Sequence, residues 1–391
     1  MVQSTIDTCL YTYRDPESDE FLWVLIYVDD GLLCDNSKPL RARFVQDLSA
    51  RFPTEDKGEL EWILNVGIVR DRVARTLTLS QSVYVNDLLT KFSPYVDESL
   101  TRHFDAPMEE GTVLSPDDCP EVNSPEHVAM RDRRQVYMSI VGGLLWLANM
   151  TRFDLAYPSG QLARFISNPG DVHFRAAVRV LIYLRSTRDR VLTYSPDLAA
   201  PFETFVDSSW TSKFSCSGAF YFFHGCLFHW FSKMQRSVSL SSAEAEYFGA
   251  TLARATCKDL IFIREILLDL GVLPLDGPSP MYSDSKSAVD MAYDPIAFKK
   301  TKHILRAAEF LRDLVAKRVA TLHHLKGTVM IADILTKAVA RVLFLTLVQL
   351  IDSFSSNRES VPPDVVSSRA RRALGPGGAV TGQDHDVVVT E

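Results

Sequence analysis

The sequence predicts a multidomain protein that combines α+β and α/β architecture, and three observations lead to this prediction. The chain has 391 residues, more than one ordinary domain holds, which suggests two or three compact units. Hydrophobic residues make up 46% and charged residues 23% of the sequence, so the chain can bury large cores. The order of strand-like and helix-like segments also changes near residue 200.

The first hundred residues read as short strands and amphipathic helices. Two apolar runs rich in β-formers, Leu22–Val28 and Gly31–Cys34, predict a pair of strands around a turn that holds Asp29 and Asp30. Hydrophobic spacing and alternation predict helices at residues 39–52 and 82–92 and a strand at residues 76–79.

The middle of the chain is expected to be helical. Residues 94–125 are rich in Pro, Asp, Glu and Ser, which is typical of a linker or an extended crossing. Residues 136–150 and 172–186 then have the spacing of two helices.

The pattern after residue 200 predicts a mixed five-stranded sheet with flanking helices. Strands are expected at residues 202–206, 218–223, 227–231, 281–283 and 319–325, and helices at 241–270, 285–293, 302–317 and from about 330. Three consecutive strands followed by strands alternating with helices indicate an antiparallel start and parallel later strands. The Ser, Pro, Gly and Arg-rich end of the chain is expected to be a disordered tail.

The cysteines and the apolar segments favour an intracellular protein. The six cysteines lie far apart, without a C-x-x-C pair, which argues against a disulfide framework or a zinc finger and for a reducing compartment. No signal peptide is visible. The longest apolar run near the end, residues 342–351, is too short to span a bilayer.

The net charge of −7 is uneven along the chain. Residues 136–340 contain 23 Lys and Arg against 18 Asp and Glu, a local charge of +5, so the rest carries −12. Because a local basic surface can attract a polyanion, the middle of the chain is compatible with nucleic-acid binding.

Four acidic residues stand at element ends of the last domain. Asp207 ends the first strand, Glu246 lies in the long helix, Asp284 follows the fourth strand, and Asp333 begins the last helix. Four converging carboxylates would repel one another unless divalent cations sat between them. Such a cluster suits two-metal phosphodiester hydrolysis, in which hard oxygen ligands hold Mg²⁺ or Mn²⁺.

Each of these residues also has a structural explanation. Asp284 could be the N-cap of the next helix, and Asp333 could complement a helix dipole. Glu244 fits a capping box that begins at Ser241, whereas Glu246 has no such capping role. Asp29 and Asp30 could likewise bind Mg²⁺ for phosphoryl transfer, or simply support a β-turn.

Several motifs of the chain resemble those of the Pol polyprotein of copia-type retrotransposons. Tyr27-Val-Asp-Asp30 and Val141-Gly-Gly-Leu-Leu-Trp146 resemble their reverse transcriptase. Ser239-Leu-Ser-Ser-Ala-Glu-Ala-Glu-Tyr247, Thr301-Lys-His-Ile304 and Ala332-Asp-Ile-Leu-Thr-Lys337 resemble their ribonuclease H. The resemblance covers residues 1–345.

This resemblance implies a division into four parts. These are a partial reverse-transcriptase palm and thumb start (1–100), a linker and helical thumb or connection region (101–198), a ribonuclease H-like domain (199–345) and a disordered tail (346–391). Asp207, Glu246, Asp284 and Asp333 match the ribonuclease H ligands for two metal ions, which serve to cut the RNA strand of RNA–DNA hybrids. Asp29 and Asp30 match the metal-binding pair of the polymerase palm.

Polymerase activity is expected to be absent. The family needs a third palm carboxylate on an earlier strand, together with the fingers, and only about 26 residues precede Tyr27. The alternative for the whole chain is a catalytically dead retrotransposon relic, or a nucleic-acid-binding module.

The expected partners are an RNA–DNA hybrid, template RNA or DNA and the rest of a retrotransposon polyprotein, with no membrane. The expected location is intracellular, either the cytoplasm, within a virus-like particle, or the nucleus. The candidate nucleic-acid contacts are Lys233, Arg236, Lys299, Lys300, Lys302 and His303. A charge cluster of this kind more often forms a solvated face than a binding site.

Overall fold

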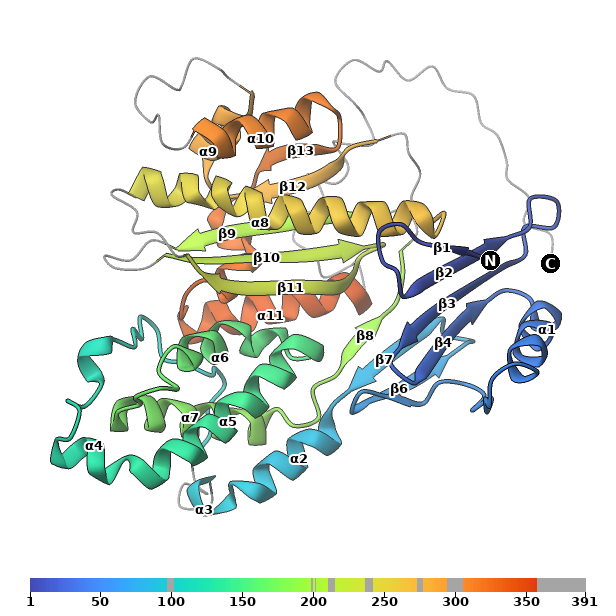
Figure 1. Ribbon diagram of the computed structural model, residues 1–391. Coiled ribbons are helices and arrows are strands. Elements are labelled where there is room, and N and C mark those ends of the chain that lie inside the picture. Colours follow the sequence, from blue (N-terminus) through green and yellow to red (C-terminus); the bar gives the residue numbers. More distant parts are fainter. Residues whose placement is uncertain are drawn as a thin grey trace.

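The structure is a computed structural model in which three sheets and a helical region can be traced (Figure 1). It describes residues 1–96, 102–197, 200, 202–209, 215–235, 242–272, 277–293 and 305–356. Within these ranges only the backbone is described for residues 242–255, 291, 305–308, 355 and 356.

The N-terminal sheet is an antiparallel meander in the order β1-β2-β3-β4. Its strands are β1 (Val2–Gln3), β2 (Leu10–Arg14), β3 (Phe21–Tyr27) and β4 (Asp30–Asp35). The predicted strand pair around Asp29 and Asp30 is confirmed, since Tyr27 pairs with Asp30 across a tight turn. Helix α1 (Lys38–Ser49) follows, and the side chain of Ser37 caps its first turn.

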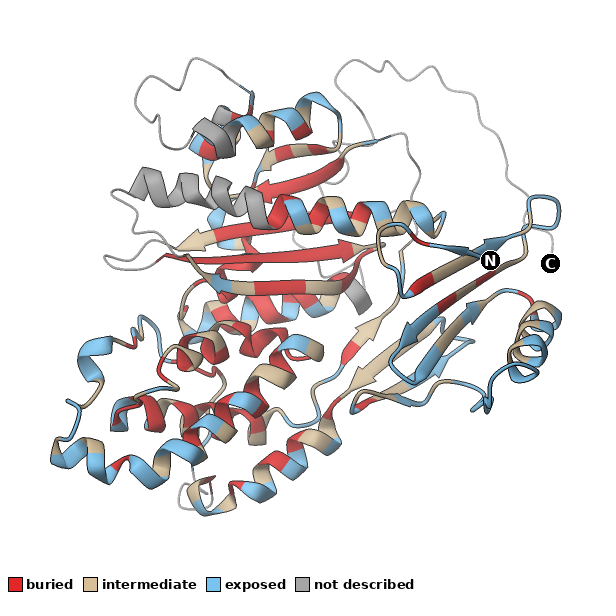
Figure 2. Ribbon diagram, in the orientation of Figure 1, coloured by how far each residue is buried: buried red, intermediate tan, exposed pale blue. Residues whose placement is uncertain are grey.

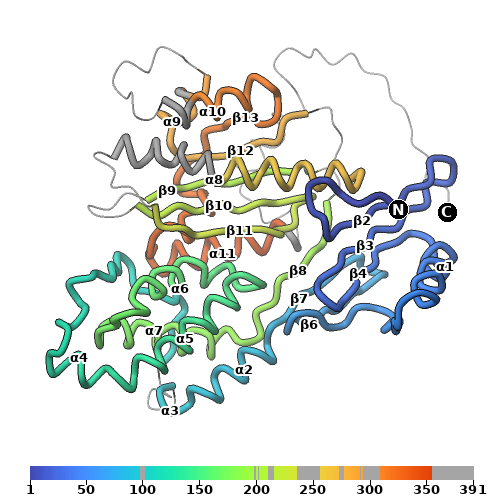
Figure 3. The backbone as a smooth tube through the Cα atoms, in the orientation of Figure 1, coloured from blue at the N-terminus to red at the C-terminus, as the bar shows by residue number. Residues whose placement is uncertain are grey.

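The second sheet joins segments that lie far apart in the sequence. Its antiparallel order is β5-β6-β7-β8, with strands β5 (Trp62–Ile63), β6 (Val66–Asp71), β7 (Thr76–Ser80) and β8 (Leu192–Tyr194). Leu79 of β7 pairs with Leu192 of β8. The chain therefore leaves this sheet at β7, makes the helical region and returns at β8, a path that Figure 3 follows.

The helical region lies between these two strands. It contains α2 (Ser82–Lys91), α3 (Ser93–Val96), η2 (Pro116–Asp118), α4 (Pro125–Ala129), α5 (Arg131–Met150), η3 (Phe153–Leu155), α6 (Ala156–Ala163) and α7 (Asp171–Ser186). The helices expected at residues 82–92, 136–150 and 172–186 are confirmed. Helix α6 and the strands β1, β2, β5, β6 and β8 are additional to the prediction.

The predicted mixed five-stranded sheet is confirmed, with the order β11-β10-β9-β12-β13. Its strands are β9 (Glu203–Ser209), β10 (Cys216–Phe223), β11 (Cys226–Met234), β12 (Ser279–Ser283) and β13 (Ala320–His324). Strands β9, β10 and β11 pair antiparallel, whereas β12 runs parallel to both β9 and β13.

Consecutive residues along the central strands are buried (Figure 2). Because side chains alternate between the two faces along a strand, both faces of this sheet are buried. Val206 and Tyr221 face a core with the helices α8 (Ser242–Asp269), α9 (Lys286–Tyr293) and α10 (Leu305–Ala316). Phe205 and Phe220 face the opposite core, which also contains residues of α2, α5 and α7. The helical region and the five-stranded sheet therefore share one hydrophobic core.

The end of the chain differs from the prediction in two ways. Residues 331–335 form a short 3₁₀ helix, η6 (Ile331–Leu335), and the final helix α11 (Arg341–Ser356) begins later than the predicted start near residue 330. The tail predicted from residue 346 is wrong for residues 346–356, because α11 buries Leu347, Ile351 and Phe354 in the shared core. Residues 357–391 lie outside the described residues.

A membrane-spanning helix, long and apolar enough to cross a bilayer, does not occur among the helices that the structure describes.

Candidate active site

Three of the four predicted carboxylates come together at one edge of the five-stranded sheet. Asp207 lies on β9, Asp284 directly follows β12, and Asp333 lies in η6. One carboxylate oxygen from each residue lies within 4.8 Å of the other two. The fourth predicted member, Glu246, lies on the helix α8, and its side chain is outside the described part.

The parallel pairing of β9 and β12 brings Asp207 and Asp284 to the same level. Phe205 pairs with Tyr282, and each aspartate stands two residues further along its own strand. The carboxyl ends of parallel strands meet at the same edge of a sheet. Two residues that lie 77 positions apart in the sequence are therefore neighbours because of this register.

Asp333 reaches the same edge because η6 packs directly on β10. Gly218 of β10 lies opposite Asp207 in the strand register, and a Cβ atom on Gly218 would overlap the Cβ of Leu335. Two further contacts hold the segment, since Ser209 Oγ donates to the carbonyl of Thr336 at 2.7 Å and Cys216 Sγ donates to the carbonyl of Leu335 at 3.6 Å.

Thr336 and Lys337 complete the polar contacts of the cluster. Thr336 Oγ1 donates a hydrogen bond to Asp207 Oδ2. Lys337 Nζ lies 3.0 Å from Asp333 Oδ1 and 3.7 Å from Asp207 Oδ2. Neither residue has a role predicted from the sequence. Their positions three and four residues after Asp333 were the available signal, because such residues share one face of a helical turn.

The electrostatics of the cluster favour a cation. Asp207 and Asp333 are only 5% and 6% exposed. Burial, and next the negative charge of Asp207, raise the pKa of Asp333 to about 7, although Lys337 opposes this rise. Three carboxylates with one ammonium leave an excess of negative charge on hard oxygen donors. This donor set fits a divalent cation such as Mg²⁺ or Mn²⁺.

Asp29 and Asp30 occupy an exposed turn instead. They lie at the β3–β4 turn, where Val28 adopts a left-handed backbone conformation with φ of 54°, which a β-branched residue rarely adopts. Both aspartates are exposed. Within the part of the chain that the structure describes, no third His, Cys, Asp or Glu gathers with them into a metal-binding group.

Among the six predicted nucleic-acid contacts, Lys233 lies within the residues that the structure describes. Lys233 is an exposed residue of β11, and its Nζ lies 4.9 Å from the centre of the Phe231 ring. Outside the described residues lie Arg236, Lys299, Lys300, Lys302 and His303.

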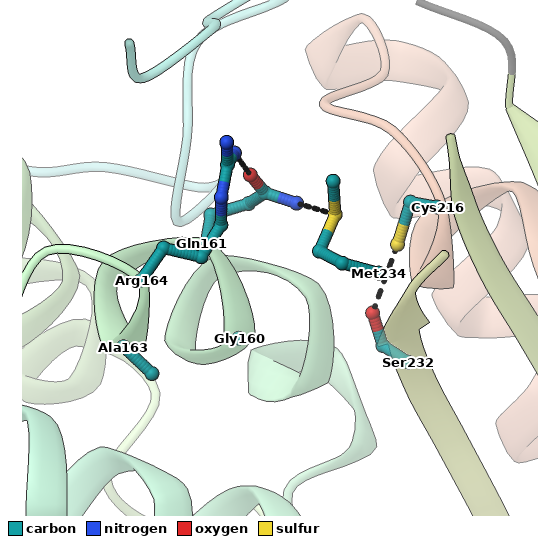
Figure 4. Close-up of a pocket in the computed structure, with 7 residues that line it drawn as sticks. All are labelled: Gly160, Gln161, Ala163, Arg164, Cys216, Ser232 and Met234. Carbon is teal, nitrogen blue, oxygen red and sulfur yellow. Dashed lines mark hydrogen bonds between the residues drawn. The ribbon is translucent and has the colours of Figure 1, made fainter. Parts of the chain in front are cut away.

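A pocket of about 320 Å³ lies between α6 and the adjacent strands β10 and β11 (Figure 4). The buried amide of Gln161 donates from Nε2 to Met234 Sδ at 3.1 Å, and its Oε1 accepts from Arg164 Nη1 at 2.8 Å. Cys216 also lines the pocket, and burial raises the pKa of its thiol to about 11. Cys216 stands two residues before Gly218, the residue of β10 that pairs with Asp207. No sequence pattern predicts this pocket.

Comparisons with known proteins identify relatives over most of the chain. The retrovirus-related Pol polyprotein from transposon TNT 1-94 of Nicotiana tabacum is 32% identical over 354 residues, which are 90% of this chain and 26% of that protein. The corresponding polyprotein from transposon RE1 of Arabidopsis thaliana is 29% identical over 347 residues, or 88% of this chain and 22% of that protein. The chain thus spans about a quarter of the length of these relatives.

No protein-family model matches the chain. The solved structure of the foamy viral protease–reverse transcriptase in complex with an RNA/DNA hybrid aligns with 78% of this chain and 36% of that chain, at a TM-score of 0.40 and 13% sequence identity.

Proposed function

Because the chain belongs to the Pol polyprotein family of copia-type retrotransposons, we propose that its carboxylate cluster hydrolyses the RNA strand of RNA–DNA hybrids. The observation that carries this proposal is the grouping of Asp207, Asp284 and Asp333 within 4.8 Å. The place of Asp207 and Asp284 near the carboxyl ends of β9 and β12 supports it, because open sheets present their ligand sites there.

The chain's own residues would hold and orient the reacting groups. Asp207, Asp284 and Asp333 would hold the cation, and we propose Glu246 as the fourth ligand because the resemblance places it there. Thr336 fixes the carboxylate of Asp207 through its hydrogen bond, so that this ligand is oriented before substrate arrives. When bound, a pair of divalent ions supplies an activated water and stabilises the leaving oxygen.

The hybrid is proposed to lie across the sheet edge and the neighbouring helical region. Arg164 lines the pocket beside β10 and β11, and Lys233 is exposed on β11. As cations, both are proposed to contact backbone phosphates. The proposal keeps Arg236, Lys299, Lys300, Lys302 and His303 as further contacts from the sequence analysis. The rest of a retrotransposon polyprotein stays a proposed partner.

Polymerase activity is proposed to be absent from this chain. The support is that, in the part of the chain described by the structure, Asp29 and Asp30 lack a third acidic neighbour. Two carboxylates alone leave a metal-ion site short of protein oxygen ligands. Incorporation of dNTPs on a primed RNA template by the purified chain, with Mg²⁺, would disprove this proposal.

Cleavage of a labelled RNA–DNA hybrid by the full chain in Mg²⁺ tests the nuclease proposal. We expect cutting of the RNA strand and a rate at least about a hundredfold lower for Asp207→Asn, because this variant loses a charged ligand while its shape is kept. The matched control is Asp313→Asn, since Asp313 is a half-exposed partner of Lys317 and does not belong to the cluster. The control should cleave like the wild type.

Three results are informative. Equal cleavage by wild type and Asp207→Asn would place the activity elsewhere and overturn the proposal. A folded wild-type chain that binds the hybrid in a salt-dependent manner but does not cut would support the alternative, a nucleic-acid-binding module with a dead nuclease site. A folded chain that neither cuts nor binds would support the retrotransposon relic.

A further inference from the structure

Lys337 has a position in the cluster that the proposed function does not use. Its Nζ lies between two buried carboxylates, 3.0 Å from Asp333 Oδ1 and 3.7 Å from Asp207 Oδ2. These are two of the three residues whose carboxylate oxygens lie within 4.8 Å of one another. The ammonium therefore contacts the oxygens that a metal ion would need.

The backbone of this residue is fixed, whereas its side chain can leave. The amide of Lys337 donates to the carbonyl of Asp333 at 3.1 Å, and the neighbouring amide of Thr336 donates to the same carbonyl at 3.1 Å. The Lys337 side chain is nevertheless 42% exposed, in contrast to the carboxylates it contacts. Its four-carbon stem is flexible, so the ammonium can move into solvent without disturbing η6.

We propose that Lys337 is an exchangeable internal cation, which neutralises the carboxylates of Asp207 and Asp333 in the ion-free protein and withdraws when a divalent cation binds. This inference rests on the proposed function, because it assumes that the cluster is a metal centre. The class of ligand is a hard divalent cation, with Mg²⁺ as the probe.

Charge repulsion prevents the Lys337 ammonium and a divalent cation from occupying the carboxylate cluster at the same time. An ammonium and a divalent cation that shared the same carboxylate oxygens in a partly buried site would repel each other strongly. Binding of the metal therefore includes the cost of breaking the contacts of Lys337. Lys337 weakens the affinity for the metal and, in exchange, stabilises the ion-free fold against repulsion between the three carboxylates.

A scaffolding role would have the opposite consequence. If Lys337 mainly held Asp333 in its ligand geometry, its removal would weaken metal binding. The sign of the change in affinity thus separates the two roles, and it needs no measurement of cleavage.

Mg²⁺ affinity of the full chain, measured by titration calorimetry, provides the test. Lys337→Met keeps the aliphatic stem and removes the charge. We expect its dissociation constant for Mg²⁺ to fall by on the order of fivefold or more, and its ion-free melting temperature to fall while Mg²⁺ restores it. Lys337→Arg keeps the charge and should stay within about twofold of the wild type.

The chain offers a closely matched control. Lys317 and Asp313 form another contact between residues four apart, at 2.7 Å, and neither residue belongs to the cluster. Lys317→Met should leave the Mg²⁺ affinity unchanged. Lys337→Gln, measured in parallel, gives a second uncharged variant with a different shape, so the result does not depend on the folding of the Met variant alone.

The outcomes separate this inference from the function it rests on. Unchanged or weaker Mg²⁺ binding in both uncharged variants, with a wild type that binds Mg²⁺ and cleaves, would overturn the role of Lys337 and leave the nuclease proposal intact. Absence of Mg²⁺ binding by the wild type and by all variants would overturn both.

Discussion

Arg152 and Asp154 form an ion pair that is buried on all sides. Arg152 Nη2 lies 2.7 Å from Asp154 Oδ2, and the two side chains are 1% and 0% exposed. Tyr183 Oη donates to the same carboxylate at 2.7 Å, and Thr187 accepts from the guanidinium through its side chain and its carbonyl. Since buried charges are tolerated only when paired and hydrogen-bonded, this network fixes η3 against α7.

Loss of the Asp154 charge is expected to be costly. Asp154→Asn leaves the charge of Arg152 buried without its partner, which should lower the free energy of unfolding by about 3–5 kcal/mol. The control is Asp189→Asn, since Asp189 pairs with Arg188 on the surface at 3.5 Å and should lose less than about 1 kcal/mol. Urea denaturation at pH 7 measures both, and equal losses would contradict the assignment.

The lowered pKa of Asp154 also predicts that the folded protein loses stability in acid. Burial alone would raise the pKa of Asp154, but the charge and hydrogen bonds of Arg152 outweigh it and lower the pKa to about 2. Because the folded value lies below the ordinary 3.8, the contribution is complete above about pH 4 and is lost as the pH falls toward 2. Urea denaturation across this range should show a steeper pH dependence for wild type than for Asp154→Asn.

At the scale of elements, the packing of η6 on β10 assembles the carboxylate cluster. The absence of a side chain on Gly218 allows this approach, and the residues on the inner side of η6, including Ile331, Asp333 and Leu335, are buried. The sequence predicted a helix start here and not a 3₁₀ helix docked on a strand. The glycine pairs across from Asp207, so the same contact brings two of the three carboxylates together.

Gly218→Ala is therefore expected to damage both stability and the site. The new Cβ would overlap that of Leu335 and push η6 away, at about 1–3 kcal/mol of unfolding free energy, and Mg²⁺ affinity should fall with it. Gly142→Ala is the control, because an added Cβ there meets nothing within 4 Å and a helical alanine is favoured over glycine by about 1 kcal/mol. Thermal unfolding and calorimetry would show whether the two variants differ, and similar behaviour would refute the packing argument.

At the scale of the whole molecule, one hydrophobic core connects the helical region, the five-stranded sheet and α11. Trp230 of β11 donates from Nε1 to the carbonyl of Ala148 in α5 at 2.7 Å. Phe354 of α11 lies 5.1 Å from Phe222 between ring centres, and Arg190 pairs with Asp352 at 2.7 Å. A segment limited to residues 199–345 would expose the face of the sheet that these contacts cover.

Truncation tests this shared core. A chain that ends at residue 356 should keep the melting temperature of the full chain within about 2 °C, whereas a chain that ends at residue 345 should lose its cooperative transition. The shorter chain lacks Leu347, Ile351 and Phe354, whose burial contributes about 1.5–3 kcal/mol each, a sum comparable with the stability of a typical domain. Circular dichroism and tryptophan fluorescence would follow the melting, and identical curves for both truncations would contradict the shared core.

The sequence by itself determined the local secondary-structure elements and the acidic residues that are candidate metal ligands. Alternating and helical patterns predicted the β3–β4 turn, the helices α2, α5 and α7 and the five strands in their mixed arrangement, because hydrophobic periodicity is a local property. It also singled out Asp207, Glu246, Asp284 and Asp333 as candidate metal ligands, of which the structure groups Asp207, Asp284 and Asp333.

Only the tertiary structure decided which residues meet. The pairing of β7 with β8 across more than a hundred residues, the docking of η6 at Gly218, the contacts of Thr336 and Lys337 with Asp207 and the burial of α11 all depend on partners distant in sequence. Periodicity shows which face of an element is apolar but does not name the surface that covers it. Close packing selects that surface among many apolar alternatives, so the site and the shared core follow from the fold.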